Sequence, residues 1–168
     1  TMLLLHGWGG GNLALELRAF VVPYWRRAGF DVVLFQLPFH GKRAPKPGRS
    51  GALFPSPHVA RTNEAFAQAV HDLRALMIWL RGEGTPAIGA MGMSLGGYTT
   101  ALLASVEPSL AFAVPMIPAV SMSALMWRQS AGSTAAPAAI QSRLIDSRCR
   151  PKATPTPGGA GALRGGRD

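Results

Sequence analysis

The sequence has few charged residues, a single cysteine and no long apolar run, and each shortage excludes a class of protein. Charged residues make up 15% of the 168 and hydrophobic residues 48%, which is typical of a globular chain and not of a disordered one. Cys149 cannot form an internal disulfide alone, so the disulfide-framed secreted class is excluded and a cytoplasmic protein is expected. No apolar run approaches the ~20 residues of a membrane span.

Acidic residues are also scarce, which leaves a net charge of +9. Such a charge is compatible with nucleic-acid binding. However, four basic residues lie in the Pro/Gly-rich stretch 42–49, six lie beyond residue 142, and the rest are scattered without the signature of a recognition module. We therefore expect no nucleic-acid partner and expect the side chains of residues 42–49 to be solvated.

Apolar strand patterns alternate with helical ones along the first two thirds of the chain. Residues 64–81 have the strongest helical period, and Pro23 is expected to bend or divide an earlier helix. The expected strands are Met2–Leu5, 32–37, 87–93 and 110–117, and the expected helices are 13–28, 64–81 and 95–107. This alternation predicts an α/β fold with a parallel sheet, its third strand central and helices on both faces.

The composition changes near residue 129. Pro and Gly dominate the end of the chain, and no strand or helix period survives there. We expect one partial domain over residues 1–128 and a disordered tail over 129–168, either a flexible linker or coding sequence read out of frame. Because Thr1 leads directly into a strand pattern, we also expect the chain to be a fragment.

The stretch GMSLG, from Gly92 to Gly96, places a serine between two glycines after an apolar strand and before a helix. Small residues on both sides allow a tight strand-to-helix turn that exposes the serine hydroxyl as a nucleophile. The N–H of Leu95 would then face a developing oxyanion. The alternative is a serine that merely caps the helix.

The stretch LLLHGWGGG, from Leu3 to Gly11, ends a strand at His6 and Gly7 and continues into a glycine-rich turn. This turn can offer the N–H of Trp8 as a second oxyanion donor. It fits neither nucleotide-binding loop: no Gly-Lys-Ser/Thr triplet occurs, and Asn12 stands where the last glycine of G-x-G-x-x-G belongs. No cofactor or metal is implied.

The order HGWGG, LPFHG and GMSLGG resembles the α/β-hydrolase superfamily over about residues 2–127. The resemblance implies a serine hydrolase that cleaves a small ester, thioester or amide through an acyl-enzyme on Ser94, with Trp8 and Leu95 as oxyanion donors. Two positions of the second motif depart from the family, because Gln36 replaces an acid and Phe39 a glycine.

The resemblance also implies an acid and then a histidine after the nucleophile. All four histidines precede Ser94: they are His6, His40, His58 and His71. We expect His6 to be structural and His71 solvated, whereas His40 and His58 lie near the correct sheet edge but lack any visible group that would orient them.

The acids after the serine are Glu107, Asp146 and Asp168. Of these, only Asp168 lies in a sequence, GGRD, that resembles the family's acid loop. We therefore expect this form of the chain to be inactive. A non-catalytic module that binds a small apolar ligand or a protein is the alternative, and the apolar residues 116–127 are either core or part of a cap.

Overall fold

The computed structural model describes residues 1–119 and 121. They form four strands, four α-helices and one short 3₁₀ helix. In chain order these are β1 (Met2–Leu5), α1 (Leu13–Ala19), α2 (Val22–Arg27), β2 (Val32–Phe35), η1 (Gly41–Arg43), α3 (Val59–Gly82), β3 (Gly89–Met93), α4 (Leu95–Val106) and β4 (Ala113–Met116). The expected tail lies outside the described residues, as do residues 120 and 122–127 of the apolar segment.

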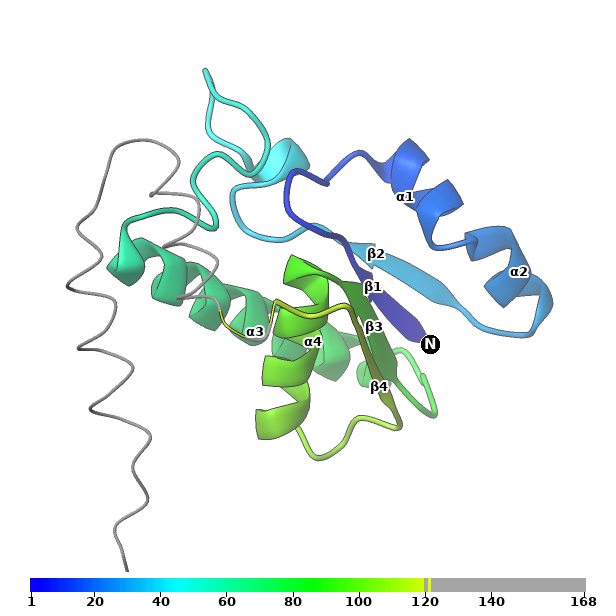
Figure 1. Cartoon of the computed structure of the whole chain (residues 1–168). Coiled ribbons are helices and arrows are strands. Elements are labelled where there is room, and N and C mark those ends of the chain that lie inside the picture. The colour runs from blue at the N-terminus through cyan, green and yellow to red at the C-terminus, as the bar shows by residue number, and fades with distance from the viewer. Residues whose placement is uncertain (120, 122–168) are drawn as a thin grey trace, which may run out of the picture. The chain divides into compact units, whose positions relative to one another are not determined.

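The four strands form one parallel sheet in the order β2-β1-β3-β4, which confirms the predicted α/β class and the internal position of the third strand (Figure 1). Leu5 of β1 pairs with Phe35 of β2 and with Gly92 of β3. The carboxyl ends of these three strands therefore meet at one edge. Loops that follow them are brought together there, where parallel α/β sheets place their sites.

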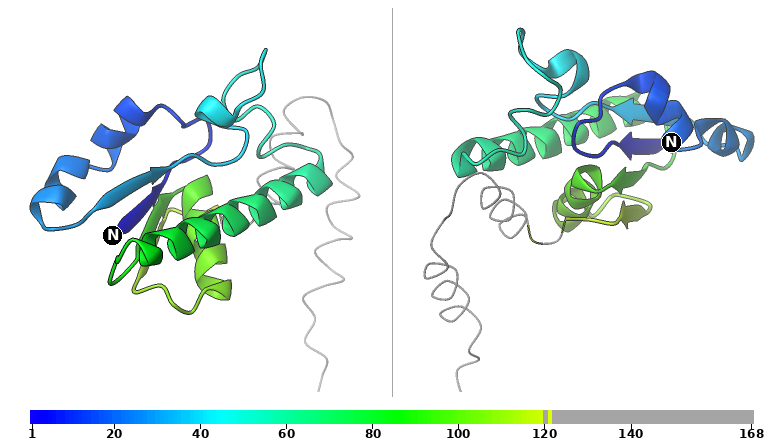
Figure 2. Two further views of the ribbon diagram at one scale, coloured as in Figure 1. Left: turned by 180° about the vertical axis from the view of Figure 1, so that it is seen from behind. Right: turned by 45° about the horizontal axis from the view of Figure 1, so that its top comes forward.

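Helices cover both faces of the sheet, as predicted: α3 and α4 lie on one face, and α1 and α2 lie on the other (Figures 1 and 2). The strand side chains alternate between two apolar clusters because successive residues of a strand point to opposite faces. Leu3 and Leu5 pack with α3 and α4, whereas Met2 and Leu4 pack with Phe20 and its neighbours. The larger cluster contains Leu37, Phe54, Phe66, Leu73, Met77, Ile88, Leu95 and Leu103.

The expected helix over residues 13–28 is two helices, but the break precedes Pro23. Val21 adopts left-handed backbone angles, φ 51° and ψ 42°, and α2 begins at Val22. Pro23 lies in the first turn of α2, where its missing N–H has no helical partner to lose. The proline thus starts the second helix instead of bending the first.

Helix α3 begins at Val59, five residues before the start that the apolar period predicted. Its first turn contains few apolar side chains, but Thr62 continues the buried face, and its hydroxyl accepts a hydrogen bond from the Ser56 N–H at 3.0 Å. The last three strands are also shorter than predicted, because ladder pairing stops within the predicted ranges 32–37, 87–93 and 110–117. They cover Val32–Phe35, Gly89–Met93 and Ala113–Met116. No helix among residues 1–119 is long and apolar enough to cross a membrane.

Candidate active site

Ser94 occupies the junction between β3 and α4 in a strained backbone conformation. Its φ is 55° and its ψ is −110°, a region that non-glycine residues rarely adopt. The Ser94 N–H donates to the Met116 carbonyl at 3.0 Å, and its carbonyl accepts from the Tyr98 N–H at 2.9 Å. Its backbone polar groups are therefore both used, and its side chain stays half-buried at the carboxyl edge of the sheet.

The glycines on either side of Ser94 are required by close backbone contacts. A Cβ on Gly92 would lie 2.2 Å from the Gly96 carbonyl oxygen, and one on Gly96 would lie 2.1 Å from the Leu5 carbonyl oxygen. Real Cβ atoms do not approach backbone oxygens so closely, so neither position accepts a side chain without a shift of the backbone. The turn around the serine therefore depends on both glycines of the sequence motif.

The glycine-rich loop, residues 6–11, passes beside this serine. A Cβ on Gly7 would lie 3.6 Å from the Ser94 Cβ, which is ordinary contact distance. Neither the backbone N–H of Trp8 nor that of Leu95 has a hydrogen-bond partner among the described residues. The Leu95 N–H is one of the free donors of the first turn of α4. Two unused donors therefore belong to the segments that meet at Ser94.

His6 is buried and structural. Its Nδ1–H donates to the Gly7 carbonyl at 2.8 Å, and its Nε2 accepts from the Leu37 N–H at 3.1 Å. Burial lowers the pKa of His6 below its usual value, and the bond to Gly7 only partly offsets this. The ring links the glycine-rich loop to the end of β2 as a neutral imidazole, and its acceptor nitrogen is already in use.

His40 is fully buried 4.9 Å from the His6 ring, centroid to centroid. The sequence showed no group to orient this ring, but the Pro38 carbonyl does so by accepting from Nδ1–H at 2.8 Å. Burial lowers the pKa of His40 to about 4, so the ring is neutral near pH 7. Its Nε2 has no partner in the described structure and faces Gly51, where a Cβ would approach it to 2.7 Å. His40 is therefore a packed core residue.

Of the other histidines, His58 directly precedes α3 and His71 lies on it. His58 stands exposed at the start of the helix, and the His71 side chain is 80% exposed, with Nδ1 3.8 Å from the Asp72 carboxylate. No histidine hydrogen-bonds to Ser94 in the described part of the chain.

Among the acids after the serine, Glu107 terminates α4 at the end opposite Ser94, about 18 Å along the helix at ~1.5 Å per residue. Hydrogen bonds from Ser109 and then Arg74 lower its pKa. Glu107 therefore takes part in a distant ion pair, and Asp146 and Asp168 lie outside the described residues.

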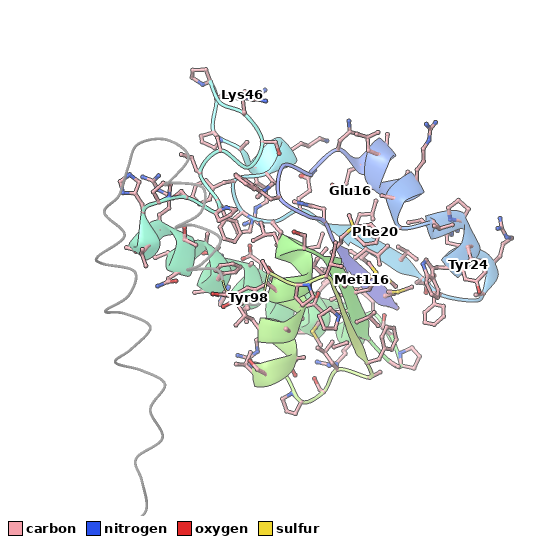
Figure 3. The ribbon with its side chains drawn as sticks, viewed as in Figure 1. Glu16, Phe20, Tyr24, Lys46, Tyr98 and Met116 are labelled. Atoms are coloured by element: carbon pink, nitrogen blue, oxygen red, sulfur yellow. The ribbon has the colours of Figure 1, made fainter. Side chains whose placement is uncertain are left out.

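Sequence reasoning missed three polar side chains that contact the glycine-rich loop. They are Glu16, Gln36 and Ser50, which lie on α1, after β2 and after η1. Figure 3 shows Glu16 on the side of α1 that faces the loop. Glu16 is buried, and this burial raises its pKa. No motif marks Glu16 or Ser50, and the departure of Gln36 from the family motif did not predict this contact, because the three side chains meet the loop only through the tertiary fold.

A groove of about 290 Å³ opens beside the loop after β2, and Ser94 is not among the residues that line it. The groove is lined by two arginines, a glutamate, a glutamine and three apolar residues. These are Pro38, Phe39, Arg43, Arg61, Glu64, Ala65 and Gln68. Within residues 1–119, no three His, Cys, Asp or Glu side chains lie together as a metal site.

Comparison with known proteins agrees with this fold. The chain is 37% identical over 134 residues to an uncharacterized protein of Mycobacterium tuberculosis strain H37Rv, and equally so to one of strain CDC 1551 / Oshkosh. Each match covers 76% of this chain and 31% of the relative, so the chain spans about a third of the relatives' length. A family described as the alpha/beta hydrolase fold matches residues 1–153. The chain therefore belongs to the alpha/beta hydrolase fold family.

Proposed function

We propose that this chain carries the nucleophile and oxyanion site of a serine hydrolase that forms an acyl-enzyme on Ser94. The observation that carries the proposal is the strained Ser94, φ 55°, held at a strand-to-helix junction by glycines that admit no side chain. Strain of this kind is retained where the surrounding structure fixes it, often at functional sites. An ordinary helix-capping serine needs neither the positive φ nor the crowded glycines.

The proposed chemistry follows from the groups at this edge. The Ser94 Oγ attacks the carbonyl carbon of an ester, thioester or amide, and the carbonyl oxygen becomes an oxyanion that the Trp8 and Leu95 N–H groups stabilise. The alcohol, thiol or amine then leaves with a proton, and the acyl group remains on Oγ. Water attacks this ester in the second step and releases the acid.

The described residues supply no general base that could accept the Ser94 proton. The resemblance implies a histidine on a later segment, whereas all four histidines precede Ser94. The described rings of His6 and His40 are held in the core. The Ser94 proton would pass to water or hydroxide, so acylation should be slower by several orders of magnitude than with a base.

The absence of a histidine after Ser94 in this sequence supports a second candidate function, that of a binding module that keeps the turn at Ser94 without catalysis. A fluorophosphonate separates the two, because it phosphonylates a serine that is presented to an oxyanion site. We expect slow labelling of this chain, mapped by peptide mass to the segment with Ser94 and absent in Ser94→Ala. Ser105→Ala, an exposed serine of the same helix, is the matched control and should label normally. Labelling that is absent from the parent chain, or unchanged in Ser94→Ala, would leave the binding module as the better account.

A further inference from the structure

The glycine-rich loop is held by side chains from three other segments of the chain. The Glu16 Oε1 accepts from the Gly11 N–H at 2.5 Å, and the Gln36 Nε2 donates to the Gly11 carbonyl at 2.7 Å. The Ser50 hydroxyl donates to the Gly10 carbonyl. Three neighbouring backbone groups of the loop are thus fixed by side chains, whereas the Trp8 N–H has no hydrogen-bond partner within the described part of the chain.

Gln36 is itself held on its other side, so its amide has one orientation. Its Oε1 accepts from the Lys42 N–H at 3.3 Å, and its backbone carbonyl accepts from Arg43 at 3.0 Å. Arg43 is fixed in turn by a 2.6 Å ion pair with Asp72 on α3. The amide nitrogen is therefore directed at Gly11, and a continuous set of contacts joins α3 to the glycine-rich loop.

The backbone of Gly11 also lies close to the backbone of Gly41. Gly11 and Gly41 have positive φ angles of 103° and 53°. A Cβ on Gly11 would lie 2.5 Å from the Gly41 N, and one on Gly41 would lie 2.5 Å from the Gln36 Nε2 and 2.6 Å from the Gly11 carbonyl oxygen. The backbones of Gly11 and Gly41 therefore lie close together beside the Gln36 amide, with no space for a side chain on either residue.

The chemistry of this contact needs a donor at position 36. A carboxylate has only acceptors and would place a negative charge 2.7 Å from the Gly11 carbonyl oxygen. We infer that Gln36 is a positioning residue: it fixes the glycine-rich loop so that the Trp8 N–H is presented at Ser94. This inference rests on the proposed function, and it gives a physical reason for an amide where the α/β-hydrolase resemblance predicts an acid.

Two variants and a matched control test the role of Gln36. Gln36→Met keeps the length of the side chain but removes its polar groups, and Gln36→Glu keeps the shape but removes the donor. Ser105→Ala is the control, because it also removes a side-chain donor to a backbone carbonyl, that of Leu102 at 2.7 Å on α4, and Ser105 takes no part in the contacts that hold the loop. Hydrogen exchange resolved by mass spectrometry reports the order of residues 6–11 and of β3. The fluorophosphonate labelling rate reports the presentation of Ser94.

We expect both Gln36 variants to speed amide exchange over residues 6–11 by about tenfold, the effect of losing one well-formed hydrogen bond. We expect them to slow Ser94 labelling by at least a similar factor, with exchange in β3 unchanged. Ser105→Ala should change neither readout. If Gln36→Met does not fold, Ser50→Ala removes the neighbouring bond to Gly10 from a half-exposed position and should act in the same direction.

Unchanged exchange over residues 6–11 in the variants would overturn the inference. Faster loop exchange with an unchanged labelling rate would also overturn it, since the order of the loop would then not matter to the serine. If the parent chain shows no labelling at all, the proposed function fails and the positioning role fails with it. In that case, a loop-specific rise in exchange would identify Gln36 as a structural clamp alone.

Discussion

At the scale of single residues, Ser94 and the histidines differ in what their surroundings allow. Ser94 has a strained backbone and a half-buried side chain, whereas the rings of His6 and His40 are buried and hydrogen-bonded to backbone groups. The nitrogen that a base would need is bonded to Leu37 in His6 and covered by Gly51 in His40. Neither ring is placed to take the Ser94 proton.

The pH dependence of Ser94 labelling tests this arrangement. Without a bonded base, the reactive alkoxide fraction grows about tenfold per pH unit, so the logarithm of the labelling rate should rise linearly from about pH 6 to about pH 9. The rate of fluorophosphonate labelling, measured at several pH values over this range, tests this expectation. A plateau with a midpoint near the ordinary histidine pKa would show that a ring does serve as the base, and replacing each histidine in turn would identify it.

The buried His40 predicts a loss of stability in mild acid. Its folded-state pKa of about 4 lies below the usual 6.5, so the unfolded chain binds the proton first, and stability is lost as the pH falls from 6.5 towards 4. The free energy of unfolding should drop by about 2 kcal/mol between pH ~7.5 and pH ~5 from this group. The lowered pKa of His6 acts in the same direction, and the raised pKa of Glu16 opposes both at the acid end.

Urea unfolding at the two pH values checks this prediction. His40→Asn retains a donor for the Pro38 carbonyl and removes the titrating ring, so its pH dependence should be shallower than that of the parent. His71→Asn, at an exposed position of α3, should retain the full dependence. Equal slopes in all three proteins would show that His40 does not govern acid stability.

At the scale of elements, the turn from β3 into α4 depends on glycine at fixed positions. Gly96→Ala would place a Cβ 2.1 Å from the Leu5 carbonyl oxygen of β1, so we expect it to destabilise the fold by roughly 2–3 kcal/mol and to abolish Ser94 labelling. Gly82→Ala, with nothing within 4 Å, is the matched control and should be neutral or stabilising by up to ~1 kcal/mol. Denaturant unfolding measures both, and an equally stable, fully labelled Gly96→Ala would contradict the account of the turn.

Some features of the helices and strands could be predicted from the sequence, and others could not. The class, the parallel strands and the apolar face of α3 could be predicted, because they follow from local periods and from the turn at Ser94. The start of α3 and the break at Val21 could not, since a buried threonine and a left-handed valine leave no local signal. The contacts of Glu16 and Gln36 with Gly11 depend on three segments meeting, so they become visible only in the fold.

At the scale of the whole molecule, the basic residues among residues 1–119 are divided between the loop 42–49 and the helices α1, α2 and α3. Lys42, Lys46 and Arg49 are exposed, and Figure 3 shows Lys46 at the outer end of its loop. Arg43 differs from the expectation of free solvation, because it pairs with Asp72 and lies 5.9 Å from the centre of the Phe35 ring. The absence of a nucleic-acid partner stays a prediction.

Binding to a mixed-sequence DNA duplex at several salt concentrations checks that prediction. We expect only weak binding that vanishes near physiological salt, because no set of phosphate contacts is built into this loop. Tight binding that falls steeply with salt, and is lost when Lys42, Arg43, Lys46 and Arg49 are all changed to Ala, would prove it wrong.

An acyl group on Ser94 is the intermediate that the proposed reaction requires, so trapping this group is the sharpest test of the proposed function. The chain is exposed to p-nitrophenyl acetate, quenched in acid and mapped by peptide mass. Because no described base assists the second step, we predict that acetyl accumulates on the peptide with Ser94, at most one per chain, and disappears in Ser94→Ala but not in Ser105→Ala. Acetyl spread over surface lysines alone, with an identical pattern in Ser94→Ala, would contradict the proposed function.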